Sequence, residues 1–277
     1  EAIDTAVVLP GSLSVEWTDH SKDIHPWTIS DGKLKSGNVG YDASSSAISF
    51  TYTSEYPTEL TFDCYNNSPY YNPSGTNYDV DHNESRLYID GKEDLVLSSG
   101  PTTWSRVYYM PAGTHTVMLK DSIDANSNYQ DLFYQSKLAG LYTTLDNVKV
   151  FEMPHLDSAL LTNNSLPMEF FNESEYVWKT TDGYAKSTNA TVSGSESVFY
   201  STITVDKPSL LSFEWLVGKD YSSHYTQFII NDKVFAKNSA NTSWTYQSVV
   251  LPAGTYTVKW RDYTSSANNA YYSQVRN

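Results

Sequence analysis

One long stretch of this amino-acid sequence occurs twice. The second half repeats landmarks of the first half in the same order, with small insertions and deletions between them. A repeat of this length is typical of a duplicated whole domain rather than of a short solenoid unit. The length of 277 residues also agrees with two domains. The matched landmarks are Trp27 with Trp178, Asp31-Gly32 with Asp182-Gly183, Lys35-Ser36 with Lys186-Ser187, Leu60 with Leu211, Phe62 with Phe213, Trp104 with Trp244, Pro111-Ala112-Gly113-Thr114 with Pro252-Ala253-Gly254-Thr255, and Asp146-Asn147-Val148 with Ser273-Gln274-Val275.

Alternation of apolar and polar residues in both copies predicts β-strands. Leu60, Phe62 and Cys64 share one face of such a strand, and Leu211, Phe213 and Trp215 share the equivalent face in the second copy. Abundant Tyr and Trp and the lack of a long apolar helical stretch favour the same all-β class. In the first copy we expect strands near residues 60–64, 86–90, 94–98, 104–109, 115–120 and 145–150.

The chain is therefore expected to form two tandem antiparallel β-sandwich domains related by internal duplication. We place the first at residues 1–153 and the second at residues 154–277, with a linker at about residues 152–167. Asp90-Gly91 predicts a tight hairpin in which both residues have positive φ, and Asn231-Asp232 tolerates that conformation in the second copy.

Composition excludes several classes of partner. The formal charge of −14 argues against binding to nucleic acid or to an anionic membrane surface. No segment is long and apolar enough to insert into a membrane. The single cysteine, Cys64, precludes an intrachain disulfide, and its phase predicts a small buried core residue. The chain begins at Glu1 rather than at a methionine, which we expect of a processed or excised fragment.

The two copies differ most in two long loop insertions of the first copy, at residues 65–84 and 121–142. Counting antiparallel strands places both insertions at one end of the sandwich. Their tyrosine rings and amides suit a sugar, whose C–H faces lie on aromatic rings while its hydroxyls bond amides. The alternative is that these tyrosines pack the loops onto the sandwich. The candidate ligand-binding residues are Tyr65, Tyr70, Tyr71, Tyr78, Asn126, Asn128 and Tyr129.

One cluster of oxygen-bearing side chains raises a structural calcium ion as the only candidate cofactor. Its members, the candidate metal ligands, are Asp79, Asp81, Asn83 and Glu84. Calcium prefers several carboxylate and carbonyl oxygens close together. The glycine and the distant glutamate of an EF-hand are missing, so a solvated acidic loop is the alternative.

Nothing in the sequence favours catalysis, and we predict that the chain is not an enzyme. No nucleophile elbow, zinc motif or phosphate loop is present. A glycosidase would need two facing carboxylates, for example Asp79 or Asp81 against Asp121 or Asp124. The acidic positions shared by the copies have structural interpretations as a turn, an outward strand position and a strand end: Asp31/Asp182, Asp63/Glu214 and Asp121/Asp262. His115 and the pair Trp104/Trp244 are expected to pack in the core.

Several segments of the first copy resemble a family of modules. They are Trp-Thr-Ile-Ser-Asp-Gly (27–32), Leu-Lys-Ser-Gly (34–37), Leu-Tyr-Ile-Asp-Gly (87–91), Pro-Ala-Gly-Thr-His-Thr-Val (111–117) and Leu-Asp-Asn-Val-Lys-Val (145–150). The string is similar to the jelly-roll modules of large bacterial cell-surface and secreted proteins, of the cleaved-adhesin, MAM-like and carbohydrate-binding groups. The resemblance implies a jelly-roll sandwich outside the cell and a role in adhesion or carbohydrate binding.

Our leading hypothesis is a monomeric, non-catalytic pair of binding modules that recognise glycan, at the surface of a bacterium or secreted from it. Two weak sites on one chain raise avidity when both reach the ligand. The alternative is a structural spacer without a ligand.

Overall fold

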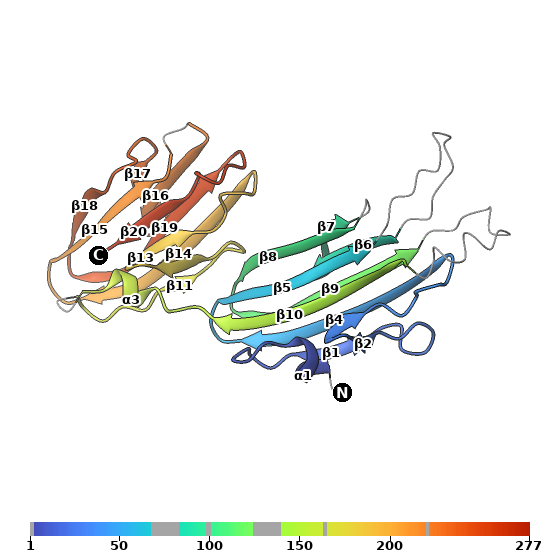
Figure 1. Cartoon of the computed structure of the whole chain (residues 1–277). Helices are drawn as coiled ribbons and strands as arrows, with labels where there is room; N and C mark the ends of the chain where they lie inside the picture. Colours follow the sequence, from blue (N-terminus) through green and yellow to red (C-terminus); the bar gives the residue numbers. More distant parts are fainter. Residues whose placement is uncertain (1–2, 68–82, 98–100, 124–139, 163–164, 220–221) are drawn as a thin grey trace. The chain divides into compact units, whose positions relative to one another are not determined.

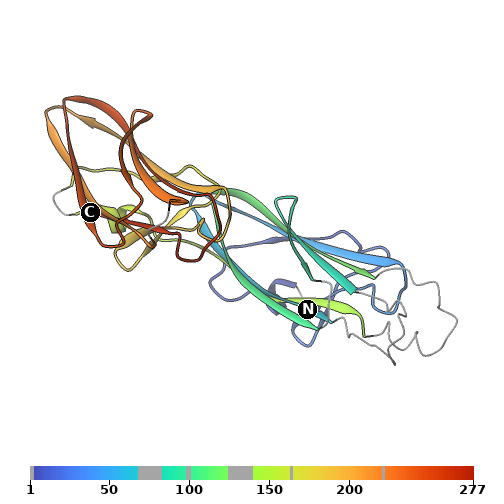
Figure 2. The same ribbon diagram turned by 90° about the horizontal axis from the view of Figure 1, so that it is seen from above.

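The computed structural model describes residues 3–67, 83–97, 101–123, 140–162, 165–219 and 222–277. The chain divides into two compact units (Figure 1). The first comprises Glu1–Ser54, Glu59–Tyr108 and Gly113–Phe151, and the second comprises Glu152–Asn277 with the short segments Glu55–Thr58 and Tyr109–Ala112. Within each unit the strands form two layers, which Figure 2 shows from above. The protein therefore consists of two tandem β-sandwich domains, as the sequence predicts.

Each domain contains two antiparallel five-stranded sheets, which we call its first and second sheets. The first sheet of domain 1 has the order β1 (Glu16–Asp19), β4 (Ser44–Ser54), β9 (Gly113–Ile123), β6 (Asn83–Ile89), β7 (Lys92–Leu97). Its second sheet has the order β2 (Thr28–Ser30), β3 (Lys33–Lys35), β10 (Tyr142–Glu152), β5 (Thr58–Asn67), β8 (Thr102–Met110).

Domain 2 repeats this topology strand for strand. Its first sheet has the order β11 (Phe171–Asn172), β14 (Ser195–Val205), β19 (Gly254–Thr264), β16 (His224–Ile230), β17 (Lys233–Asn238). Its second sheet has the order β12 (Trp178–Thr181), β13 (Tyr184–Ser187), β20 (Ser273–Arg276), β15 (Ser209–Val217), β18 (Thr245–Leu251). Identical strand orders in both sheets establish the internal duplication.

Local chemistry accounts for the strand connections. Asp90 and Gly91 have φ of 50° and 78°, and Asn231 and Asp232 have φ of 48° and 62°, which confirms both predicted tight hairpins. The Asp90 carboxylate accepts the backbone N–H of Thr116 at 2.8 Å, so it also fixes the turn to β9. All six strands predicted for the first copy are present, although most are longer at one or both ends.

Within the described ranges, two short helices lie beside the sandwiches. Helix α1 (Ile3–Val7) packs against β3, and helix α3 (Asp157–Leu160) packs against β12, β13 and β20. Of the segment predicted as a linker, Leu156, Ala159 and Leu160 are buried in the core of domain 2. No helix among the described residues is both long and apolar enough to cross a bilayer.

The core of domain 2 is aromatic. Phe199 stacks on Trp260 with centroids 4.8 Å apart, and Phe213 and Phe228 meet Trp260 at 5.3 Å and 5.0 Å. Such pairs stabilise beyond the area that they bury. In domain 1 the predicted core residue Cys64 is buried, and burial raises the pKa of its thiol to about 12. His115 is also packed, as predicted, with Nδ1 lying 2.7 Å from Asp90 Oδ2.

Candidate binding face

In each domain, we call the surface of the second sheet that faces away from the core the outer face. Aromatic and charged side chains lie together on the outer face of domain 2. Alternation along β13 buries Ala185 and Ser187 and turns Tyr184 and Lys186 outward. Alternation along β20 likewise turns Tyr272 and Arg276 outward.

Trp244 is the largest ring on this outer face. Its ring centroid lies 5.9 Å from that of Tyr184, and the Arg276 guanidinium lies 4.1 Å from its centroid. Glu214 holds Arg276 through a bond of 2.8 Å between Oε2 and Nε. The indole is thus fixed between a second ring and a paired guanidinium while remaining half-exposed.

A lysine–tyrosine pair lies beside this group. Lys186 Nζ is 4.0 Å from the centroid of the Tyr272 ring, a distance typical of cation–π attraction. Burial, and next the positive charge of Lys179, lower the pKa of Lys186. No carboxylate among the described residues forms an ion pair with Lys186, so its ammonium group can bind an anion or a hydroxyl oxygen.

Domain 1 has a lysine–tyrosine pair at the same place. Lys35 Nζ lies 4.0 Å from the centroid of the Tyr142 ring. The strand registers make the pairs equivalent, because Lys35 faces Thr144 across β3 and β10 as Lys186 faces Gln274 across β13 and β20. Outward positions do not have to repeat to keep a core packed. The lysine–tyrosine pair is therefore an outward feature that both domains share.

On the outer face of domain 1 this pair borders a hollow of about 460 Å³. Lys33 Nζ bonds Asp146 Oδ2 at 2.9 Å, which raises the pKa of Lys33. Hydrogen bonds from Ser105 and Asn147, in that order, lower the pKa of Asp63. The hollow is lined by Ser30, Asp31, Lys33, Lys35, Asp63, Cys64, Tyr65, Thr103, Tyr142, Thr144, Asp146 and Asn147.

The registers correct two matches made from the sequence. Val275 pairs with Ala185 as Leu145 pairs with Leu34, so Ser273-Gln274-Val275 corresponds to residues 143–145 and not to Asp146-Asn147-Val148. Trp244 directly precedes Thr245, which faces the inward Trp215, and so Trp244 points outward. The expectation that it packs in the core is wrong.

Trp104 lies in different surroundings. It packs half-buried on Phe62 and Tyr108, with ring centroids 5.8 Å and 5.9 Å away. Both of these partners are buried, so Trp104 belongs to the inner face, as predicted. Trp104 and Trp244 occupy positions that differ by one residue along equivalent strands. Because side chains alternate between the two faces of a strand, one points inward and the other outward.

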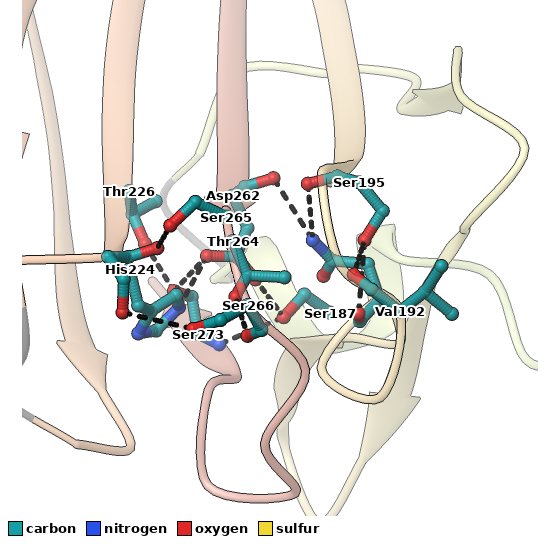
Figure 3. Close-up of polar contacts among 12 residues, drawn as sticks. Ser187, Val192, Ser195, His224, Thr226, Asp262, Thr264, Ser265, Ser266 and Ser273 are labelled. Atoms are coloured by element: carbon teal, nitrogen blue, oxygen red, sulfur yellow. Dashed lines mark hydrogen bonds and ion pairs between the residues drawn. The ribbon is translucent and has the colours of Figure 1, made fainter.

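A buried polar centre lies behind each outer face. In domain 2, Asp262 accepts hydrogen bonds from Ser187 Oγ at 2.6 Å and Ser273 Oγ at 2.8 Å, and its Oδ1 lies 2.7 Å from His224 Nε2 (Figure 3). Ser187 Oγ also accepts the backbone N–H of Ser273 at 2.9 Å. We call Ser187, His224, Asp262 and Ser273 the polar tie, because they join β19 and β16 of the first sheet to β13 and β20 of the second.

Domain 1 has an equivalent centre around Asp121. Its carboxylate accepts hydrogen bonds from Ser36 Oγ at 2.8 Å and Thr143 Oγ1 at 2.7 Å, and Ser36 Oγ accepts the Thr143 backbone N–H at 3.0 Å. Burial raises the pKa of Asp121 to about 6, although hydrogen bonds from Thr143, Ser36, Asn38 and Asn83 oppose the shift.

The polar tie positions the outer face through sequence neighbours. Ser187 follows Lys186 and Ser273 follows Tyr272, so the hydroxyls bonded to Asp262 hold the backbone beneath the lysine–tyrosine pair. Ser36 and Thr143 stand in the same relation to Lys35 and Tyr142. The sequence analysis interprets Asp121 and Asp262 as a strand end, and the side chain is fully buried in both domains.

A close approach between Gly218 and Tyr272 further fixes the outer face. A Cβ at Gly218 would lie 2.5 Å from the backbone oxygen of Ala270 and 2.7 Å from the Tyr272 ring. We therefore expect Gly218→Ala to displace Tyr272 and to lower the free energy of unfolding of domain 2 by about 1–3 kcal/mol. Urea denaturation and the NMR signals of the Tyr272 ring measure both effects.

A Tyr272→Ala background supplies the control for this prediction, because it removes the ring that Gly218→Ala would strike. The alanine at position 218 should cost less free energy there than in the wild type. Equal costs in both backgrounds, with unchanged Tyr272 signals in the single variant, would contradict the close approach of Gly218 to the Tyr272 ring.

The residues predicted as a sugar site are only partly within the described chain. Tyr65 lies on the outer face of domain 1, donates to Asn67 Oδ1 at 3.0 Å and has its centroid 6.3 Å from that of Tyr142. The other members, Tyr70, Tyr71, Tyr78, Asn126, Asn128 and Tyr129, lie outside the described residues. The strands that flank the insertions end side by side, since Asn83 of β6 faces Ile123 of β9.

The predicted metal cluster is likewise divided. Asn83 is buried, and Glu84 Oε1 accepts a hydrogen bond from Arg86 Nε at 2.5 Å. Asp79 and Asp81 lie outside the described residues. Within the described ranges, no group of three or more His, Cys, Asp and Glu side chains could hold a metal ion.

Comparison with known proteins adds no family assignment. No protein-family model matches the chain, and no curated protein matches it significantly. Similar solved structures include adhesin and carbohydrate-binding domains of bacterial surface and secreted proteins. Identities of 10–17% and TM-scores of at most 0.34 carry no conclusion about what this chain binds.

Three of these structures illustrate the range. The secreted serine protease VesC from Vibrio cholerae is 13% identical with a TM-score of 0.34, and the alignment covers 86% of this chain but about half (48%) of that one. The K3 cleaved adhesin domain of Lys-gingipain from Porphyromonas gingivalis is 13% identical, with a TM-score of 0.30. The alignment covers 41% of this chain and 92% of that one. The CBM22-1-CBM22-2 tandem domain of Paenibacillus barcinonensis Xyn10C is 10% identical, with a TM-score of 0.26. The alignment covers 97% of this chain and 98% of that one.

Proposed function

We propose that the protein is a pair of non-catalytic carbohydrate-binding modules, each of which takes its ligand on the outer face of its second sheet. The observation that carries the proposal is the outward lysine–tyrosine pair that recurs at equivalent positions in both domains. In domain 2 the half-exposed Trp244 lies on the same face, next to Arg276 and Glu214.

The chemistry of this face matches a sugar. A pyranose ring presents C–H groups that rest on an aromatic face, and Trp244 offers such a face. Its hydroxyls need donors and acceptors close to the ring, which Lys186, Gln274 and Glu214 supply. The ammonium of Lys186, which forms no ion pair with any carboxylate of the described residues, also suits a sugar carboxylate, so the ligand class includes uronic acids. The net charge of −14 disfavours strongly anionic polymers as general ligands.

The proposal includes a role outside the bacterial cell, which the resemblance of the sequence to surface and secreted modules supports. Two faces on one chain would raise avidity for a repeating polysaccharide by up to roughly 10²–10⁴ when both are engaged.

A glycan array that contains neutral and uronic-acid oligosaccharides tests the proposal. We expect Trp244→Ala to weaken binding by domain 2 at least about tenfold, equivalent to about 1.4 kcal/mol, because the stacking surface is lost. Tyr225→Ala is the matched control, since Tyr225 is also an aromatic ring under a lysine, with Lys237 Nζ at 4.1 Å, but lies on the first sheet. Both variants are compared in a Lys35→Ala/Tyr142→Ala background, so that domain 1 does not mask the loss. Equal losses in the two variants, or no loss in Trp244→Ala, would exclude the outer face of domain 2.

A further inference from the structure

The two outer faces differ in charge at positions that the fold makes equivalent. Both contain a lysine over a tyrosine ring, Lys35 in domain 1 and Lys186 in domain 2, each at 4.0 Å from the ring centroid. The residue directly opposite this lysine on the edge strand is different. Thr28 faces Lys35, whereas Lys179 faces Lys186. Since the lysine–tyrosine pair is common to both faces, the charges around it determine how their ligands differ.

Domain 2 brings two ammonium groups together on its outer face. Lys179 and Lys186 are cross-strand neighbours on β12 and β13, an arrangement in which like charges repel. No carboxylate among the described residues forms an ion pair with either lysine. Glu214, an acid of the same face, is bonded to Arg276 at 2.8 Å. An anion bound between the two lysines would relieve their repulsion, and a neutral hydroxyl would not.

The charge of one further position is reversed between the domains. By strand register, Arg276 stands where domain 1 has Asp146. Asp146 accepts a bond from Lys33 at 2.9 Å, and Tyr184 stands at the position of Lys33 in domain 2. The face of domain 2 has therefore exchanged an acid for a base where domain 1 keeps an internal ion pair.

The hollow on the outer face of domain 1 has an excess of carboxylates. Three aspartates and two lysines line it, and one of these lysines, Lys33, is already paired with Asp146. At the equivalent positions of domain 2, together with Lys179, two acids stand against three bases. The domain 1 set is Asp31, Asp63, Asp146, Lys33 and Lys35, and the domain 2 set is Asp182, Glu214, Lys179, Lys186 and Arg276.

Asp63 is placed to receive neutral hydroxyl groups. Its carboxylate accepts bonds from Ser105 Oγ and from Asn147 Nδ2, the second at 2.7 Å, and these bonds fix its orientation. A carboxylate has about four acceptor positions, so further donors can bond to the same oxygens. The hollow of about 460 Å³ falls in the range of about 300–1,000 Å³ that is typical of small-ligand sites. A sugar hydroxyl suits these oxygens, whereas a sugar carboxylate would be repelled.

We propose that the two outer faces select different sugars. Domain 2 binds a uronic acid whose carboxylate lies between Lys179 and Lys186, and domain 1 binds a neutral sugar whose hydroxyls bond Asp63 in the hollow. Repulsion supplies selectivity as well as attraction, because a uronate in domain 1 would meet the excess of carboxylates. The inference rests on the proposed function and specifies the ligand class of each face. The two faces together fit a polysaccharide that contains both neutral and acidic residues.

Matched trisaccharides that differ only at C6 test the inference by calorimetry. The pairs are glucose with glucuronic acid, galactose with galacturonic acid, and mannose with mannuronic acid. Two variants of the 277-residue chain isolate the faces: Lys35→Ala/Tyr142→Ala leaves that of domain 2, and Lys186→Ala/Tyr272→Ala leaves that of domain 1. For each pair that a face binds, we expect domain 2 to prefer the acidic member at least about tenfold and domain 1 the neutral member by a similar factor.

Charge substitutions in these two backgrounds test the cause of the preference. Lys179→Gln should lower the acidic preference of domain 2 at least about threefold. Lys237→Gln is its matched control, because Lys237 also lies over a ring, that of Tyr225, but on the first sheet, and it should change nothing. In domain 1, Thr28 is exposed, so Thr28→Lys places a second lysine opposite Lys35 without disturbing the core. It should move the preference at least about threefold toward the acidic sugar, whereas Thr28→Gln should not.

The outcomes separate this inference from the proposed function. The same preference at both faces, binding by one face only, or preferences that ignore Lys179→Gln and Thr28→Lys would overturn the inference and leave carbohydrate binding intact. Failure of both backgrounds to bind any of the trisaccharides, although the unsubstituted chain is folded, would overturn the proposed function and the inference together.

Discussion

Replacing Asp262 by alanine is expected to lower the free energy of unfolding of domain 2 by about 3–5 kcal/mol. The carboxylate accepts bonds from Ser187 and Ser273 and contacts His224, and all four side chains are buried. Alanine would leave these groups without their acceptor and would open a cavity. A loss of this size is a large fraction of the stability of an ordinary domain.

Urea denaturation measures this loss, and labelling of Cys64 shows in parallel that domain 1 keeps its stability. Asp206→Ala is the matched control, because Asp206 is an exposed acidic residue of the same domain. It should change the free energy by no more than about 0.5 kcal/mol. If Asp262→Ala is equally mild, the polar tie does not hold the sheets of domain 2 together.

The stability of domain 1 is expected to fall as the pH rises from about 4 to about 6. The folded protein binds a proton at Asp121 with a pKa of about 6, whereas an unfolded aspartate has a pKa of about 3.9. Between these values the folded state binds more protons, so a rise in pH favours unfolding. The difference of about two pH units corresponds to a loss of about 3 kcal/mol by pH 7.

Asp121→Asn should remove this dependence, because the amide does not titrate. Asp63 acts in the opposite sense, since its lowered pKa adds stability that is lost at acidic pH. The wild type and Asp121→Asn are therefore compared with each other at each pH, because both contain Asp63. The measurement is urea unfolding at pH 4.5 and 7, followed by Cys64 labelling at one fixed pH. Parallel pH profiles for both proteins would show that Asp121 does not titrate in this window.

Much of the fold was accessible from the sequence. Strand positions follow from alternation, and the hairpins at Asp90-Gly91 and Asn231-Asp232 follow from residues that tolerate positive φ. The buried aspartates carried a signal as well, since Asp121 continues the inward series His115, Val117 and Leu119. The sequence interpretation of this position was a strand end, and only the three-dimensional arrangement supplies the hydroxyls that offset the cost of burying the carboxylate.

The outer face was harder to predict because it depends on register. Matching Trp104 with Trp244 by residue type ignored a difference of one position, which reverses the direction of a side chain in a strand. The sequence match of Val148 with Val275 also conceals the equivalence of Tyr142 and Tyr272, because it shifts the last strand of one copy by three residues relative to the register in the structure. Pairing across the sheet is a long-range property that local patterns do not fix.

NMR titration of the chain with neutral and uronic-acid oligosaccharides tests the central claim, which is that the outer face of the second sheet receives carbohydrate. The account predicts that the ring signals of Trp244 and Tyr272 shift on binding, together with Tyr142 in domain 1. Signals of Tyr225 and Tyr263 on the first sheet should stay unchanged. Shifts confined to Tyr225 and Tyr263, or no shift with any oligosaccharide, would contradict it, and complete absence of binding would favour a structural spacer.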